Sequence, residues 1–345
     1  MSYQHELNRI PAVFPISLPS KVTRSINYAA RNLNSAFPSM GERHPDPKTF
    51  AFALDCAKEQ MDLILSKNDW LGYILANVEN ESIDAVYIRG LPRFKGVDSS
   101  KLHRIVGLMI GRTIGNIFQY QQQNHGVLQP ALSPEPDGPA NSNSTPDDFL
   151  GHTDDAYFIK KYRCRNIALY GEINQCGAAT GYAHSESIIQ HMNDRHVHQL
   201  FKSDYLFKLP ASFGDIPGIP EWSERRSILH ESTNGDVHIE VPTYNTEVCA
   251  GADGLALEAF EQLKKAIDST IQWFVVTGST YLMFNNNRGV HAREAIPYGN
   301  RRVYRSYWTD NESLQNMRTI CGTEGHVFDA TRFLEETANY QAQNS

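Results

Sequence analysis

The hydrophobic pattern of the chain changes near residue 116, and this change restricts the folds that it can adopt. The earlier part carries apolar residues at helical spacing, in segments that open on residues typical of helix starts. The later part has short strands and long polar loops, with one long helix. We therefore predict an α+β protein whose strands form a double-stranded β-helix, the jelly-roll core of cupins. The expected segments are helices at about 20–34, 46–67, 99–115, 185–192 and 254–270, strands at about 84–90, 166–173, 278–285, 290–295 and 300–310, and a hairpin at about 228–241.

The 345 residues are expected to form a single domain, 1–345. We expect a mainly helical N-terminal part at 1–115, a jelly-roll core at 116–312 and a C-terminal extension at 313–345. Residues 133–148 are rich in proline, serine, asparagine and aspartate, so they cannot pack a core of their own. A polar loop of this length is typically functional, and we interpret it as a lid over a binding site.

The composition argues against several classes of protein. A net charge of −7 argues against a general affinity for nucleic acid, and no apolar run is long enough to cross a membrane. The first residues lack the basic-then-apolar order of a secretory signal. Five scattered cysteines without a Cys-x-x-Cys pair indicate reduced thiols. We expect a cytoplasmic monomer or homodimer that binds neither nucleic acid nor membranes.

The segment Gly-His-Thr-Asp-Asp-Ala-Tyr-Phe at 151–158 contains a candidate metal site. His152 and Asp154 are two residues apart, so on an extended strand their side chains point to the same face. A second histidine, His291, lies 139 residues downstream in a predicted strand. Two histidines and one carboxylate form the facial triad of non-haem Fe(II) oxygenases, which leaves coordination positions open. A lone His-x-Asp occurs by chance in many proteins, so the prediction depends on the motifs around it.

A second group of histidines offers a competing interpretation. His191, His196 and His198 lie close together, and the last two have the same spacing as the first motif. However, the carboxylate at suitable spacing is Asp194, which beside Arg195 is typical of a solvated helix end. We interpret this group as surface.

Two arginines follow His291 on a predicted strand. Within residues 300–308, Arg301 and Arg305 share one face. A buried arginine is costly unless it meets an anion, and its planar guanidinium can bind a carboxylate through two hydrogen bonds. Two inward arginines beside a metal therefore predict two bound carboxylates. The alternative is an edge strand on which both arginines face water.

The ordered combination of these motifs resembles the Fe(II)/2-oxoglutarate dioxygenases. Its parts are His152-Thr-Asp154, Thr180 in a small-residue turn, Asn286-Asn287-Arg288-x-x-His291 and Arg301-x-x-x-Arg305. Within that superfamily the chain is most similar to the clavaminate synthase-like branch, with taurine dioxygenase a more distant relative. That branch includes β-hydroxylases of free arginine and asparagine. The resemblance runs over about residues 116–310, whereas the first 80 residues match nothing in it.

The resemblance implies a metal site and a co-substrate site. His152, Asp154 and His291 would be the iron ligands. Arg301 would bind the distal carboxylate of 2-oxoglutarate, together with the hydroxyl of Thr180. The implied cofactors are Fe(II), 2-oxoglutarate and O2, and the implied reaction gives succinate, CO2 and an oxidised, typically hydroxylated, substrate.

The resemblance also implies an amino-acid substrate. Arg305 would bind its α-carboxylate and Gln123 its amino-acid end. Apart from the resemblance, Asp155 or Glu240 could pair with a basic side chain if the substrate has one. Exposed acids on loops are more often merely solvated, so a basic substrate is the less favoured choice. A carrier-bound substrate, a carboxylate that is not an amino acid, and desaturation or cyclisation remain alternatives.

The sequence departs from the branch in two motifs, and two other classes of protein remain as alternatives. Asp154 stands where the branch usually has glutamate; its presence argues against halogenation, because halogenating members lack the carboxylate. The interval of 10 residues from His291 to Arg301 is shorter than usual, which leaves open which arginine binds which carboxylate. A cupin-type metalloenzyme that does not use 2-oxoglutarate would need the triad but not Arg301. In a non-catalytic jelly-roll binding protein the triad would be vestigial.

Overall fold

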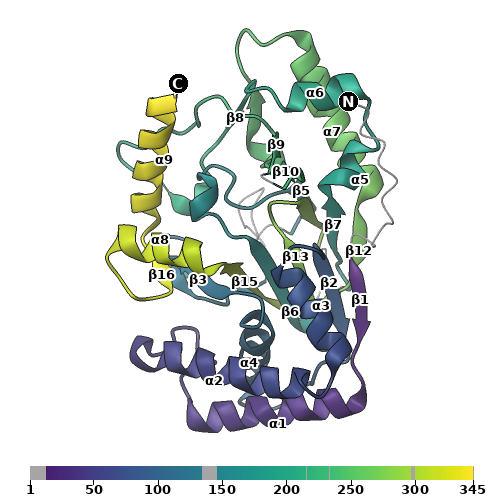
Figure 1. Cartoon of the computed structure of the whole chain (residues 1–345), viewed down its shortest axis with the longest axis vertical. Helices are drawn as coiled ribbons and strands as arrows, with labels where there is room; N and C mark the ends of the chain where they lie inside the picture. Colours follow the sequence, from purple (N-terminus) through teal and green to yellow (C-terminus); the bar gives the residue numbers. More distant parts are fainter. Residues whose placement is uncertain (1–12, 134–145, 215, 233, 297–299, 345) are drawn as a thin grey trace.

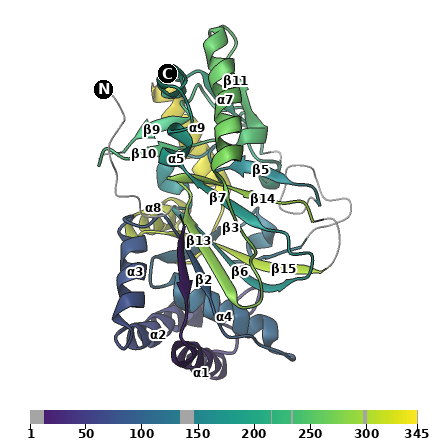
Figure 2. The same ribbon diagram turned by 90° about the vertical axis from the view of Figure 1, so that its right-hand side faces the viewer.

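The computed structural model is a mixed α+β protein with a large eight-stranded sheet, a small four-stranded sheet and two two-stranded sheets among the described residues, with helices around them (Figures 1 and 2). Most of the lid predicted at 133–148 lies outside the residues that the structure describes. Among the described residues, no helix is both long enough and apolar enough to span a bilayer. The described residues are 13–133, 146–214, 216–232, 234–296 and 300–344.

The large sheet has the strand order β1-β2-β13-β6-β15-β3-β16, and β4 also pairs with β15. The pairs β1–β2 and β3–β16 are parallel, whereas the pairs in the middle of the sheet are antiparallel. Its strands are β1 Phe14–Ser17, β2 Ala85–Arg89, β3 Asn116–Tyr120, β4 Ala131–Leu132, β6 Asn166–Asn174, β13 Thr280–Asn285, β15 Arg301–Thr309 and β16 Val327–Phe328.

The alternation of side chains along β6 divides the interior into two cores. Tyr170 packs in the core shared with the N-terminal helices, whereas Ile167 and Leu169 point to the opposite face. On that second face Tyr182 of the small sheet stacks on Phe284 of β13, with ring centroids 5.3 Å apart. The second core therefore lies between the two sheets.

Helices of the N-terminal part cover the first face of the large sheet (Figure 1). The side chain of Asp46 accepts a hydrogen bond from the Lys48 amide, and Pro47 is the first helical residue, which explains where α2 begins. The helix α3 was not predicted; Asn68 before it provides no side-chain cap. The helices are α1 Ser20–Ala36, α2 Pro47–Leu65, α3 Asp69–Glu79 and α4 Ser99–Gly111.

The small sheet has the order β12-β7-β14-β5, and α7 packs on its outer face (Figure 2). Leu263 and Ile267 of α7 contact the same core as Val290 of β14. At Gly151 a Cβ atom would clash with Ile267, so the position before His152 requires glycine. These elements are β5 Phe149–His152, β7 Thr180–His184, α7 Gly254–Thr270, β12 Gln272–Phe274 and β14 Gly289–Arg293.

The remaining elements flank the small sheet and close the second core. The predicted hairpin is confirmed, because β9 and β10 pair as antiparallel strands. Besides α3 and several short strands, the prediction lacked the N-terminal strand β1 and the helices of the C-terminal segment. In that segment Phe333 of α9 stacks on Tyr162, with ring centroids 4.7 Å apart. The elements are α5 Ser185–Ile189, α6 Asp194–Leu200, β8 Tyr205–Phe207, β9 Leu229–Glu231, β10 Val237–Ile239, β11 Thr246–Val248, α8 Asn311–Cys321 and α9 Ala330–Asn344.

Candidate metal centre

Strand pairing brings together the two histidines that are far apart in sequence. His152 ends β5, and it lies directly opposite His291 in the antiparallel pair β5–β14. The ring centroids are 4.1 Å apart. Asp154 follows in the turn after β5, with its Oδ1 at 3.4 Å from His152 Nε2 and 3.7 Å from His291 Nε2. One ligand atom from each of the three residues lies within 4.8 Å of the others, as a shared metal requires.

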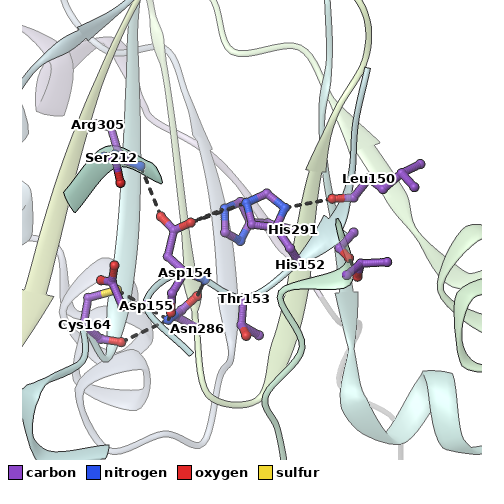
Figure 3. A network of polar contacts seen from close by, with 12 residues as sticks. Leu150, His152, Thr153, Asp154, Asp155, Cys164, Ser212, Asn286, His291 and Arg305 are labelled. Atoms are coloured by element: carbon purple, nitrogen blue, oxygen red, sulfur yellow. Dashed lines mark hydrogen bonds and ion pairs between the residues drawn. The ribbon is translucent and has the colours of Figure 1, made fainter. Parts of the chain in front are cut away.

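The protonation of the two imidazoles suits a divalent metal. His152 Nδ1 lies 2.7 Å from the Leu150 carbonyl oxygen and donates to it, so Nε2 carries the lone pair (Figure 3). That buried Nε2 has no hydrogen-bond partner among the described residues. Burial, with the neighbouring His152, lowers the pKa of His291 to about 3, which keeps this imidazole neutral. The unpartnered Nε2 of His152 and the neutral ring of His291 fit a metal ligand set.

Asp154 is held at its backbone and at its carboxylate. The Asn286 side chain accepts from the Asp154 amide at 2.9 Å and donates to the Asp154 carbonyl at 3.0 Å (Figure 3). The Oδ2 atom of Asp154 accepts hydrogen bonds from the Tyr307 hydroxyl at 2.7 Å and from Arg305 Nη1 at 3.1 Å. Burial alone raises the pKa of Asp154, but two cations outweigh it and hold the pKa below its usual value: His291, which is charged at the low pH where this carboxyl would take up a proton, and Arg305. The carboxylate is therefore ionised.

A cavity adjoins the metal ligands between the two sheets. Its lining includes both histidines, Thr180, Arg301 and Arg305. It holds about 30 Å³, so a bound dicarboxylate requires its side chains to move apart. A larger hollow of about 460 Å³ lies between β1 and α3, but its lining is mostly apolar and it contains none of the metal ligands. The chemistry therefore belongs to the smaller cavity.

Arg301 is a buried cation beside this cavity. Its side chain is 2% exposed, and its Nη1 donates to the Leu132 carbonyl at 3.4 Å. Among the described residues its Nε has no hydrogen-bond partner, and no carboxylate lies within ion-pair distance. Burial, with the nearby cation of Arg293, lowers the pKa of Arg301 to about 10. Because an unpaired buried charge is costly, this position favours binding of an anion. Thr180, which lines the same cavity, is buried as well.

The residues expected to contact the substrate form one network with Asp154. Gln123 donates to Asp155 Oδ1 at 3.4 Å and to Ser212 Oγ at 3.3 Å, and its Oε1 lies 3.4 Å from the Tyr307 hydroxyl. Burial, with the neighbouring Asp154, raises the pKa of Asp155 to about 7, and its φ of 60° is in the left-handed region. The structure thus places Gln123, Asp155 and Arg305 next to the triad.

Glu240 does not offer a free carboxylate to a basic substrate. It is buried and accepts from Arg163, and it also accepts from Arg226 at 2.8 Å. The arginine charges outweigh the effect of burial and hold the pKa of Glu240 well below its usual value. Glu240 therefore neutralises internal cations, and it is neither a solvated loop acid nor a free partner for a basic substrate.

The competing histidine group is helical. His196 and His198 lie on α6, where residues two apart do not face the same side. Asp194 is the first residue of that helix, as the surface interpretation expected. Among the described residues, the His152, Asp154 and His291 side chains form the group of histidine, cysteine, aspartate or glutamate residues that could hold a metal ion.

Sequence reasoning missed two residues that hold Asp154. Asn286 belonged to a recognised motif but had no role, and Tyr307 was not singled out. The signal for Tyr307 was present, because it follows Arg301 and Arg305 on the same face of a strand with alternating orientation. Arg288, from the same motif as Asn286, pairs with Asp84 at 3.0 Å and anchors the turn before β14.

No protein-family model matches the chain, and no curated protein matches it by sequence. Solved structures match nearly its whole length. The structure of asparagine oxygenase in complex with Fe(II), 2S,3S-3-hydroxyasparagine and succinate has a TM-score of 0.76 at 18% identity, covering 92% of this chain and 99% of that one. The chain has the fold of this oxygenase. The non-heme iron oxygenase OrfP in complex with Fe and alpha-ketoglutaric acid has a TM-score of 0.74 at 18% identity, covering 91% and 99%. The shared fold thus includes most of the N-terminal part, which the sequence resemblance did not reach.

Proposed function

We propose that this protein is a non-haem Fe(II)/2-oxoglutarate-dependent oxygenase that hydroxylates an unactivated C–H bond of a free amino acid. The observation that carries the proposal is the buried triad His152, Asp154 and His291 beside the unpaired cation of Arg301. A metal-binding triad alone would suit many enzymes, but the buried guanidinium needs an anion. Asparagine oxygenase and OrfP, which share the fold, have been solved with iron and with succinate and hydroxylated amino acids.

In this proposal His152 Nε2, Asp154 Oδ1 and His291 Nε2 would hold the iron, as the ligand set of non-haem Fe(II) oxygenases does. When bound, the iron couples oxidative decarboxylation of 2-oxoglutarate to hydroxylation. The reaction balances as substrate C–H, 2-oxoglutarate and O2 giving substrate C–OH, succinate and CO2. The Leu150 carbonyl fixes the orientation of the His152 ring, and Asn286 fixes the turn that carries Asp154.

Arg301 and Thr180 bind the distal carboxylate of 2-oxoglutarate. Arg301 supplies charge and directed N–H donors, and Thr180 supplies a hydroxyl from the neighbouring sheet. Support comes from their burial on the same cavity as the metal ligands.

Arg305, Gln123 and Asp155 bind the amino-acid substrate. Arg305 is buried, and its Nε has no partner among the described residues, so one edge of the guanidinium is available for an α-carboxylate. Gln123 contacts both Tyr307 and Asp155, and the Gln123 and Asp155 side chains provide acceptors suited to an ammonium group. Because Glu240 is already paired, the proposal does not require a basic side chain in the substrate.

The fold proposed for this function is a double-stranded β-helix in a single domain, 1–345. Two features support this fold. The small sheet is antiparallel, and it shares a hydrophobic core with the middle of the large sheet. We retain the division into 1–115, 116–312 and 313–345, the lid at 133–148, a monomer or homodimer, and a cytoplasmic location as parts of the proposal.

The test is succinate formation from 2-oxoglutarate by the Fe(II)-loaded protein in air with ascorbate. The twenty amino acids and several non-proteinogenic ones would be screened, with His152→Ala as the inactive control. Succinate stimulated by one amino acid supports the proposal, and the mass of its product separates hydroxylation from desaturation or cyclisation. Slow succinate formation that no free amino acid stimulates would move the substrate to a carrier-bound molecule or another carboxylate. Bound iron without any succinate would contradict the use of 2-oxoglutarate.

A further inference from the structure

The two oxygens of Asp154 have different surroundings. Oδ1 faces the Nε2 atoms of His152 and His291, which marks the metal side. Oδ2 faces away and accepts from Tyr307 at 2.7 Å and from Arg305 at 3.1 Å. Both donors come from β15, where residues 305 and 307 share a face, and the Arg305 guanidinium lies 4.5 Å over the Tyr307 ring.

We propose that Arg305 and Tyr307 form a carboxylate clamp that restricts Asp154 to one metal-binding oxygen, with Tyr307 as a positioning residue. The identity of the metal and reaction rests on the proposed function; the clamp itself concerns any divalent metal at the triad. Nothing in the sequence motifs assigns a role to Tyr307.

A free carboxylate can bind a metal through one oxygen or through both. Two directed hydrogen bonds, one of them from a cation, occupy the lone pairs of Oδ2 and hold it away from the metal. The coordination position that a second oxygen would fill then stays open. Aspartate has one methylene less than glutamate, so fewer torsions separate its carboxylate from the backbone. The Asn286 bonds to that backbone and the clamp therefore fix the group at both ends.

The Tyr307 hydroxyl has one proton and two acceptors nearby. Asp154 Oδ2 at 2.7 Å is the closer and charged acceptor, whereas Gln123 Oε1 lies at 3.4 Å. The proton therefore goes to Asp154, since charge-assisted hydrogen bonds are the stronger ones. Gln123 keeps an acceptor for the substrate, and Arg305 keeps its Nε edge, so the clamp and a substrate site can coexist.

The test is the metal affinity of Tyr307→Phe, which removes one donor and almost no volume. Apo-protein would be titrated anaerobically with Fe(II) and, separately, with Co(II). We expect a Kd about 10- to 100-fold higher than that of the wild type, the usual effect of losing a hydrogen bond to a ligand. The visible spectrum of the Co(II) protein, which depends on coordination number and geometry, should change as well. A Kd within about twofold of wild type, or an unchanged Co(II) spectrum, would overturn the clamp.

Tyr281→Phe is the matched control. Tyr281 is also buried in the large sheet, but its hydroxyl has no hydrogen-bond partner among the described residues. Its metal affinity and Co(II) spectrum should equal those of the wild type; an equal loss in both variants would mean a general effect of removing a buried hydroxyl and would refute the clamp. Arg305→Lys keeps the charge and one donor, and its Kd should lie between those of the wild type and Tyr307→Phe. Because these titrations need no turnover, failure of the wild type to form succinate would count against the proposed function and leave the clamp result unaffected.

Discussion

Replacing Arg301 by methionine should change two measured quantities in opposite directions. Burial and the nearby Arg293 cation lower the pKa of Arg301 from 12.5 to about 10, which corresponds to roughly 3 kcal/mol against the charged form. Methionine fills a similar volume without charge, so the free energy of unfolding of the apo-protein should rise, by roughly 1–3 kcal/mol. The affinity for 2-oxoglutarate should fall, because the distal carboxylate loses its charged partner. Breaking one buried charge pair costs about 2–4 kcal/mol, or roughly a 30- to 700-fold higher Kd.

Two assays check this pair of effects. Urea unfolding of the apo-protein gives the stability, and anaerobic calorimetric titration of the Fe(II) protein gives the Kd for 2-oxoglutarate. The matched control is Arg302→Met, next in sequence but on the other face, with its side chain 39% exposed and paired with Glu172 at 3.3 Å. It should leave the Kd unchanged and alter stability by no more than about 1 kcal/mol. An unchanged Kd in Arg301→Met would refute the carboxylate site, and a marked loss of stability would refute the idea that Arg301 is an uncompensated charge.

Three further predictions follow from the site. His152→Ala or His291→Ala should abolish iron binding and turnover, measured as iron content after anaerobic reconstitution and as succinate; full activity in either would remove the triad assignment. Asp154→Gly should admit chloride beside the metal, because Arg305 and Tyr307, which donate to Oδ2 of Asp154, remain in place. Mass spectrometry should then detect a chlorinated product when chloride is added. No chlorinated product at saturating chloride would contradict this prediction. Glu240→Gln removes the charge that pairs with the buried Arg163 and the half-buried Arg226, and it should cost about 3–5 kcal/mol in urea unfolding at neutral pH. The pKa of Glu240 in the folded protein lies well below 4.5, so the stability that its charge contributes is complete above pH 4.5 and declines as the pH falls further. The difference in unfolding free energy between wild type and variant should therefore narrow in acid. A difference that does not change with pH would show that the charge of Glu240 is not its source.

Local sequence patterns predicted helix starts and the faces of a strand correctly. Asp46 before Pro47 and Asp253 before Gly254 mark helix starts that the structure confirms, because each side chain accepts from amides of the first turn. Alternation in β15 placed Arg301 and Arg305 on one face, and both are buried at the cavity. The same rule extends to Tyr307.

What could not be predicted depends on partners that are remote in sequence. Glu240 looked like a loop acid because its partner Arg163 comes from a different segment, and no local pattern links the two. The pairing of Arg305 with Asp154 likewise depends on how β15 faces the turn after β5. The strand β1 was missed because four residues give too short a pattern, and parallel pairing with β2 stabilises it.

The strand order of the large sheet has a consequence for how the protein is made on the ribosome. β6 ends at Asn174, yet both of its neighbours, β13 and β15, come from residues 280–309. While the chain is being synthesised, β6 therefore has two unpaired edges until nearly all of the polypeptide has emerged. The second histidine of the triad, His291, also arrives in that late segment. The triad can therefore assemble only late in synthesis, and a shortened chain that ends before β15 would leave one edge of β6 without its hydrogen-bonding partner.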